Sequence, residues 1–343
     1  MKILLGTNVM FYEIGLLNEY CLSIRQALFR ETIESSDLDI TIQFLLNTDT
    51  TFEYPENNNL EKFIEDAAAI INGCLPSAEI LALTDVLLDP ELISIPCTMV
   101  NYRRYLNNRC GEYDVIVWGE IDCLLPRTCF ENIYTIHDHA VATNCAKYIM
   151  TFSDRKMWDA SWSELEHIDF KNKEYYERDN PKAFTELHSI RYTISQEELD
   201  AINEPYEESL QAKIINYPKF DGSLLIISAD LIKSGGTIPL GFWGLSGEDE
   251  AMMYSCRQVM DNEYIQYIIA NICKGHNREH PNKRIGAVSI AEKKLSTQRS
   301  KGEWYTIIRN MNKLNLQSLY APGARQTRLL TYQDYFNELN TTT

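Results

Sequence analysis

The stretch YDVIVWGEIDCLLP, residues 113–126, decides how the chain is organised. Its apolar first part predicts a buried strand over Asp114–Val117, and the carboxylates of Glu120 and Asp122 follow it directly. Residues two apart on an extended chain point the same way, so both carboxylates can face one ion. Such oxygen ligands suit Mg²⁺ or Mn²⁺. The alternative is a pair of surface carboxylates, because so short a pattern also arises by chance.

Strands and helices alternate on the amino-terminal side of this stretch. The apolar patterns predict strand 2–11, helix 16–33, strand 38–46, helix 60–73, strand 79–83 and helix 101–108. This alternation predicts an α/β fold with a mixed, mostly parallel central sheet and flanking helices. Ligands of such sheets bind at the carboxyl ends of the strands. The polar segments Gly6–Asn8 and Asn47–Thr50 are expected to lie there.

The carboxyl-terminal side of the stretch is less regular. Residues 151–215 are rich in charged and aromatic side chains, which predicts an insertion of helices and loops. A strand over Gly222–Ile227 resumes the core, and from residue 286 the pattern is helical and polar. We therefore expect one domain at 1–285 that contains the insertion at 151–215, followed by a helical extension at 286–343.

Composition and charge restrict the classes of partner. The chain has 343 residues and a net charge of -17, which disfavours general binding to nucleic acids or anionic membranes. Its nine cysteines lack zinc-like spacing, which predicts reduced thiols and a cytoplasmic location. No apolar run is long enough for a membrane-spanning helix, so we expect no membrane span.

The segment GFWGLSGEDE, residues 241–250, joins glycines, Trp243 and three consecutive acids. The acids open a predicted helix, where the helix dipole stabilises negative charge, and this is a sufficient structural reason for one of them. A carboxylate held ionised at such a place could also act as a general base on a hydroxyl.

The segment CKGHNREHPNKR, residues 273–284, contributes histidines and positive charge. His276 and His280 lie in a predicted loop, where either could ligate a metal or lie exposed. Between Lys274 and Lys301, eight basic residues are opposed by two acidic ones. Such a segment is typical of a diphosphate clamp or of a solvated basic loop.

Taken in order, these motifs resemble those of GT-A glycosyltransferases. A strand ending in Glu-x-Asp is followed by a Gly-Ser strand with a Gly-Gly stop, by Gly-Glu-Asp-Glu, and by His276, 27 residues after Asp249. Glycosyltransferase family 2 and the C-terminal domain of the β-galactosyltransferases show a similar order. The resemblance covers residues 1–130 and 215–285, and it implies a Rossmann-like GT-A fold.

The resemblance also implies roles for particular residues. Asp122 matches the metal-holding acid, and Glu120 stands where the family has aspartate, so it would reach the metal or the ribose differently. His276 is the better-spaced third metal ligand, and His280 is the second choice. Asp249 matches the catalytic base of inverting members.

Donor and acceptor residues follow from the same resemblance. Glu248 and Trp243 match positions near the acceptor and the donor sugar. The expected nucleotide-binding positions, on the polar strand ends and on the polar helix before Glu120, are Thr7, Asn8, Asn47, Asp49, Arg104 and Arg109.

The implied reaction is metal-dependent transfer of a hexosyl or pentosyl group from a nucleotide-sugar, with UDP favoured, to an acceptor hydroxyl with inversion. The aromatic insertion could bind the acceptor, which is a glycan, a protein, a lipid-linked sugar or a modified DNA base. The Asn-, Ile-, Lys- and Tyr-rich composition fits a viral or phage source, and hence the cytoplasm of a host cell.

Two other functions stay open at this point. A nucleotidyltransferase has a related fold and two metal-binding carboxylates, but it usually needs a glycine-rich phosphate loop near its start. Residues 1–11 contain only Gly6. The second alternative is a non-catalytic relative that binds a glycan or a protein.

Overall fold

The predicted alternation of strands and helices is present in the computed structural model, which describes residues 1–30, 38–48, 60–82, 98–157, 159–173, 194–215, 217–238, 248–259 and 265–277. Its first half contains β1 (Lys2–Val9), α1 (Ile14–Leu28), β2 (Asp39–Leu46), α3 (Leu60–Cys74), β3 (Glu79–Ala82), α4 (Thr98–Asn108) and β4 (Val115–Glu120). The short 3-10 helices are η1 (Phe11–Glu13), η4 (Arg109–Gly111), η5 (Ala160–Leu165), η6 (Ile168–Phe170) and η7 (Glu204–Tyr206).

The second half completes the sheet from more widely spaced segments. Its elements are β5 (Cys123–Leu124), α5 (Cys129–Ala142), β6 (Tyr148–Ser153), α7 (Gln196–Asn203), β7 (Ala212–Ile215), β8 (Leu225–Ser228), α8 (Ala229–Lys233), α9 (Glu248–Val259), β9 (Ile265–Cys273) and β10 (Gly275–His276).

The central sheet has the strand order β3-β2-β1-β4-β8-β6-β9-β7. Strands β1 to β4 are parallel to one another, and β6 and β9 form a further parallel pair. Strand β8 lies antiparallel between β4 and β6, and β7 is an antiparallel edge strand. A mixed, mostly parallel sheet with flanking helices is thus confirmed.

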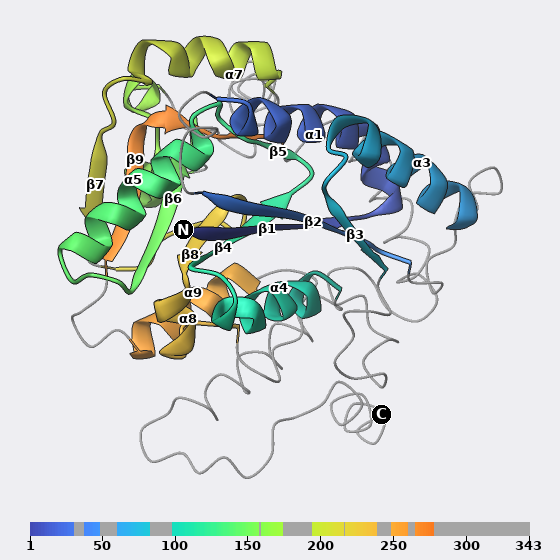
Figure 1. Ribbon diagram of the computed structural model, residues 1–343. Helices are drawn as coiled ribbons and strands as arrows, with labels where there is room; N and C mark the ends of the chain where they lie inside the picture. Colours follow the sequence, from blue (N-terminus) through green and yellow to red (C-terminus); the bar gives the residue numbers. More distant parts are fainter. Residues whose placement is uncertain are drawn as a thin grey trace, which may run out of the picture.

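Helices cover both faces of this sheet (Figure 1). Alternate residues of β1 enter opposite cores, because successive side chains of a strand point to opposite faces. Ile3 and Leu5 pack in the core under α1, α3 and α5, whereas Leu4 packs with Trp118 in the core under α4, α8 and α9. Burial on both faces explains why these strands are nearly continuous apolar runs.

The region predicted as an insertion contributes to the sheet at both of its ends. Residues 151–153 complete β6, and residues 212–215 form β7. Between them the structure describes η5, η6, α7 and η7, while residues 174–193 lie outside the described ranges. The predicted extension at 286–343 also lies outside them. Within the described ranges, no helix has the length and apolar character needed to cross a membrane.

Candidate functional site

A small two-stranded ribbon joins the acidic stretch after β4 to the histidine after β9. Strand β10 pairs antiparallel with β5, so that His276 lies opposite Cys123. The backbone N–H of Asn277 donates to the backbone oxygen of Asp122 at 2.5 Å. The ribbon therefore places His276 beside Asp122, although the two are far apart in the sequence.

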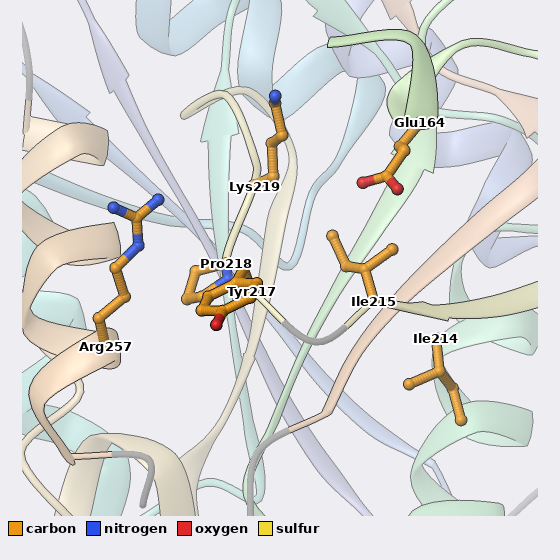
Figure 2. A pocket seen from close by; sticks show the side chains of 7 residues that line it. All are labelled: Glu164, Ile214, Ile215, Tyr217, Pro218, Lys219 and Arg257. Carbon is orange, nitrogen blue, oxygen red and sulfur yellow. The ribbon is translucent and has the colours of Figure 1, made fainter. Parts of the chain in front are cut away.

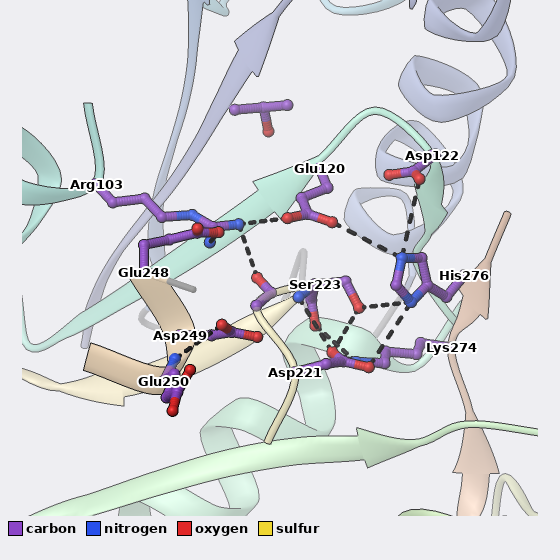
Figure 3. A network of polar contacts seen from close by, with 12 residues as sticks. Arg103, Glu120, Asp122, Asp221, Ser223, Glu248, Asp249, Glu250, Lys274 and His276 are labelled. Carbon is purple, nitrogen blue, oxygen red and sulfur yellow. Dashed lines mark hydrogen bonds and ion pairs between the residues drawn. The ribbon is translucent and has the colours of Figure 1, made fainter. Parts of the chain in front are cut away.

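Glu120, Asp122 and His276 form a compact group at the carboxyl end of β4 (Figure 3). The imidazole Nε2 of His276 lies 3.8 Å from Glu120 Oε2 and 3.8 Å from Asp122 Oδ2. One ligand atom from each residue falls within 4.8 Å of the other two. Two carboxylates and an imidazole at this separation could hold one divalent cation.

Arg103 of α4 connects this group to the start of α9. Its guanidinium donates to Glu120 Oε1 and to Glu248 Oε1, each at 2.5 Å, and its carbon Cζ lies 4.7 Å from the centre of the Trp118 ring. The side chain is only 1% exposed. It also donates to the backbone oxygen of Gly222 at 3.0 Å, and a Cβ at that glycine would stand 2.6 Å from Nη1. A side chain at position 222 would therefore displace the guanidinium of Arg103.

The arginine that contacts Glu120 is thus Arg103, which is not among the residues predicted from the sequence. Helical spacing could have found it, because Val100, Arg103 and Asn107 lie on one face of α4. Val100 and Asn107 meet the sheet there, with Asn107 Oδ1 accepting from the indole N–H of Trp118 at 2.9 Å. The buried guanidinium of Arg104 instead donates to Asn101 Oδ1 at 3.4 Å.

Arg109 lies away from the group around Glu120. It pairs with Glu112 at 2.9 Å, contacts Glu79 at the first position of β3 and lies over the ring of Tyr113. Arg109 opens η4, which lies between α4 and the first residue of β4, so it adjoins the amino end of that strand. The structure therefore does not bring Arg109 to the carboxyl edge.

Asp249 lies in the first turn of α9, next to Glu248. Burial and the charge of Glu248 raise the pKa of its carboxyl to about 6, against the opposing effect of Arg103. Its Oδ1 accepts the backbone N–H of Glu250 at 2.8 Å. A carboxyl with such a pKa is ionised near neutrality and basic enough to accept a proton.

A second acidic group lies on the other side of His276. Asp221 Oδ1 accepts from Lys274 Nζ at 2.6 Å, and Asp154 Oδ2 lies 3.6 Å from the same ammonium. Burial opposes ionisation of Asp221, but Lys274 and His276 hold its pKa well below the usual range. Burial and the nearby charge of Asp221 raise the pKa of Asp154 to about 7.

The expected nucleotide-binding positions that the structure describes on the strand ends are Thr7, Asn8 and Asn47, and all three are buried. Asn8 stands beside Glu120 in the register of β1 and β4. Thr7 Oγ1 is hydrogen-bonded to the hydroxyl of Tyr20 at 2.7 Å, on the other face of the sheet. Asn47 Nδ2 lies 2.8 Å from the sulfur of Met10. Asp49, Trp243 and His280 lie outside the described residues.

A separate hollow of about 450 Å³ lies at the edge formed by β7 (Figure 2). Its lining consists of Glu164, Ile214, Ile215, Tyr217, Pro218, Lys219 and Arg257. Glu164 supplies the one carboxylate of this lining, and no histidine belongs to it. The group of carboxylates and histidine thus lies at the carboxyl end of β4 and not in this hollow.

Comparison with known proteins gives remote structural similarity only. No protein-family model matches the sequence, and no curated protein matches it. The apo structure of mouse xyloside xylosyltransferase 1 is 10% identical, with 77% of this chain and 84% of that one covered and a TM-score of 0.36. The galactosyltransferase LgtC, solved with donor and acceptor sugar analogs, is 11% identical, with 69% and 62% covered and a TM-score of 0.28. At these values the likeness decides neither the substrate nor the reaction.

Proposed function

We propose that this protein is a GT-A type glycosyltransferase that moves a sugar from a nucleotide-sugar to an acceptor hydroxyl with the help of a divalent cation. The observation that carries the proposal is the group of Glu120, Asp122 and His276 at the carboxyl end of β4, with Asp249 close by at the start of α9. Arg103 connects the two parts through Glu120 and Glu248.

The charges at this edge support a cation. Glu120, Asp122, Glu248 and Asp249 carry four carboxyl groups, and a single guanidinium, that of Arg103, interacts with three of them. Within the described ranges, the charge of this one guanidinium is smaller than the summed charge of the four carboxylates. Mn²⁺ or Mg²⁺ held by Asp122, His276 and Glu120 would reduce this excess of negative charge. Such an ion stabilises the negative charge that develops on a departing diphosphate.

The remaining residues have separate tasks in this proposal. Arg103 occupies Glu120 Oε1, so that Oε2 is turned toward His276 and only one oxygen serves the ion. The carboxylate of Asp249 takes the proton of the acceptor hydroxyl. The acceptor oxygen attacks the anomeric carbon opposite the nucleoside diphosphate, so the bond from that carbon to the diphosphate oxygen breaks and the carbon is inverted. The polar ends of β1 and β2 bind the nucleotide, for which we favour UDP.

The test is an assay of metal-dependent turnover with UDP-, GDP- and CDP-sugars. Release of a nucleoside diphosphate with Mn²⁺ or Mg²⁺, abolished by EDTA, is the expected result. Asp138→Asn, on the exposed side of α5, serves as the control for loss of a carboxylate remote from the site. Release of pyrophosphate would replace the proposal with a nucleotidyltransferase, and saturable glycan binding without any release would replace it with a binding module.

A further inference from the structure

The ring of His276 is held between two sets of oxygen atoms. On one side Nε2 faces Glu120 and Asp122, each at 3.8 Å. On the other side Nδ1 lies 3.2 Å from Ser223 Oγ and 3.7 Å from Asp221 Oδ2 (Figure 3). The second set lies in the turn that precedes β8, which is far in the sequence from the ribbon that carries the histidine.

The hydrogen bonds of this turn determine which atom carries each proton. Asp221 Oδ1 receives the ammonium of Lys274 at 2.6 Å and the hydroxyl of Ser223 at 2.7 Å. An ionised carboxylate only accepts, so the single proton of the Ser223 hydroxyl goes to Asp221. The Ser223 oxygen is then left to accept from His276. A proton must therefore be present on Nδ1, and a neutral ring presents the lone pair of Nε2 to Glu120 and Asp122.

Lys274 ties the two segments together. Its ammonium also donates to the backbone oxygen of Ser223 at 2.7 Å, and its backbone N–H donates to the oxygen of Ser153 at 2.9 Å. The lysine is two residues before His276, and its side chain is 1% exposed. Its bonds to Asp221 and Ser223 therefore fix the distance between the turn before β8 and the ribbon.

We propose that Asp221 is a positioning residue that, through Ser223, sets the tautomer and the orientation of His276 for binding a divalent cation through Nε2. The inference rests on the proposed function. Hydrogen-bonded partners of this kind commonly contribute a factor of about 10–100 to metal affinity. Asp221 acts on the ion only through the histidine, and Lys274 keeps Asp221 in place.

The test compares Asp221→Asn and Ser223→Ala with a matched control, Glu166→Gln. Glu166 forms a buried ion pair with Lys156 at 3.0 Å, with 0% and 2% of the side chains exposed. The control therefore loses a buried acid–lysine pair without losing a group that contacts His276. Mn²⁺ affinity is measured on each full-length protein by titration, and pulsed EPR records the nitrogen coupling of bound Mn²⁺.

The wild type is expected to bind Mn²⁺ with a nitrogen coupling that His276→Ala removes. Asp221→Asn and Ser223→Ala should weaken Mn²⁺ binding by about 10–100-fold and diminish that coupling, whereas Glu166→Gln should retain both. If Asp221→Asn and Ser223→Ala both kept the Mn²⁺ affinity and the nitrogen coupling of the wild type, the positioning role would be overturned and the metal site would stand. Absence of Mn²⁺ binding by the wild type would instead overturn the proposed function, and the inference with it. If Asp221→Asn fails to fold, Ser223→Ala alone decides the matter.

Discussion

His276 lies between two pairs of acidic residues, and different groups balance the negative charge of each pair. On the inner side, Asp221 and Asp154 enclose the ammonium of Lys274, and their side chains are 3% and 9% exposed. On the outer side, Glu120 and Asp122 face Nε2 of the same ring, with 18% and 1% of their side chains exposed.

The difference indicates what each side is suited to do. A lysine is covalently part of the chain, so the inner acids have a permanent counter-charge and can hold neighbouring groups in place. The outer acids meet an imidazole and one oxygen of Glu120 is already used by Arg103. We infer that the outer side takes an exchangeable cation and the inner side keeps its histidine in position.

The largest effect is expected from a variant that blocks proton transfer on the outer side and leaves metal binding unchanged. Asp249→Asn keeps the shape of the side chain but cannot accept a proton, so turnover should fall by about 10²–10⁴-fold. Titration of UDP with Mn²⁺ should remain at the wild-type affinity, because Asp249 is not in the group around His276. Turnover at the wild-type rate would show that another residue is the base.

Replacing Lys274 tests whether its ammonium stabilises the acids of the inner side. Lys274→Met leaves Asp221 and Asp154 buried without their ammonium, which should lower the free energy of unfolding by about 3–5 kcal/mol. Urea unfolding in EDTA measures this loss. Mn²⁺ bound at the outer site should stabilise every protein that keeps that site. Since Asp154, Asp221 and His276 could themselves hold an ion, Mn²⁺ should stabilise Lys274→Met by more than it stabilises the wild type. Lys156→Met is the control, with a similar loss in EDTA and the same gain from Mn²⁺ as the wild type. An extra gain in both variants, or in neither, would contradict the distinction between the two lysines.

A change on the opposite face of β4 should affect the fold and spare the site. A Cβ at Gly119 would overlap Thr7 Oγ1 and the hydroxyl of Tyr20. Gly119→Ala is therefore expected to lower the free energy of unfolding by about 1–3 kcal/mol, the usual cost of overpacking. Mn²⁺ affinity, measured below the melting temperature, should stay close to that of the wild type. A large loss of affinity would show that the two faces of β4 are not independent.

The smallest effect on turnover is expected from a change in pH. The pKa of Asp249 is raised to about 6, and a general base works only when ionised. Turnover should therefore fall about tenfold for each pH unit below that value and level off above it. The measurement is kcat between pH 5 and 8 at saturating donor and metal. A profile that is flat across this range would remove Asp249 from the reaction, as would the same acid limb in Asp249→Asn.

Sequence patterns predicted the parts of the molecule that depend on local periodicity. The strands and helices up to β4 follow from apolar spacing, and the closeness of Glu120, Asp122 and His276 followed from the order of motifs. The antiparallel insertion of β8 between β4 and β6 was not predicted, because strand order depends on long-range pairing. Nor was the contact of Arg103 with Glu120 predicted, because it depends on which face of α4 meets the sheet.

The inner group around Lys274 was also missed. Asp154, Asp221 and Lys274 belong to three separate segments, and neither their spacing nor their neighbours distinguish them from ordinary surface charges. Only the pairing of β6 with β8 and β9 brings these segments together. Their roles, and those of Glu120, Asp122, His276 and Asp249, remain predictions that binding and activity measurements decide.

The most direct measurement is a Mn²⁺ titration, followed by EPR, of three proteins: the wild type, Asp122→Asn and Asp154→Asn. The two variants each remove one carboxylate charge, from the outer and the inner side of His276 respectively. We predict that the wild type and Asp154→Asn bind one Mn²⁺ with similar affinity, and that Asp122→Asn binds it at least about 100-fold more weakly, beyond the usual effect of an indirect partner. Retained binding in Asp122→Asn together with loss in Asp154→Asn would place the ion on the inner side and contradict the account.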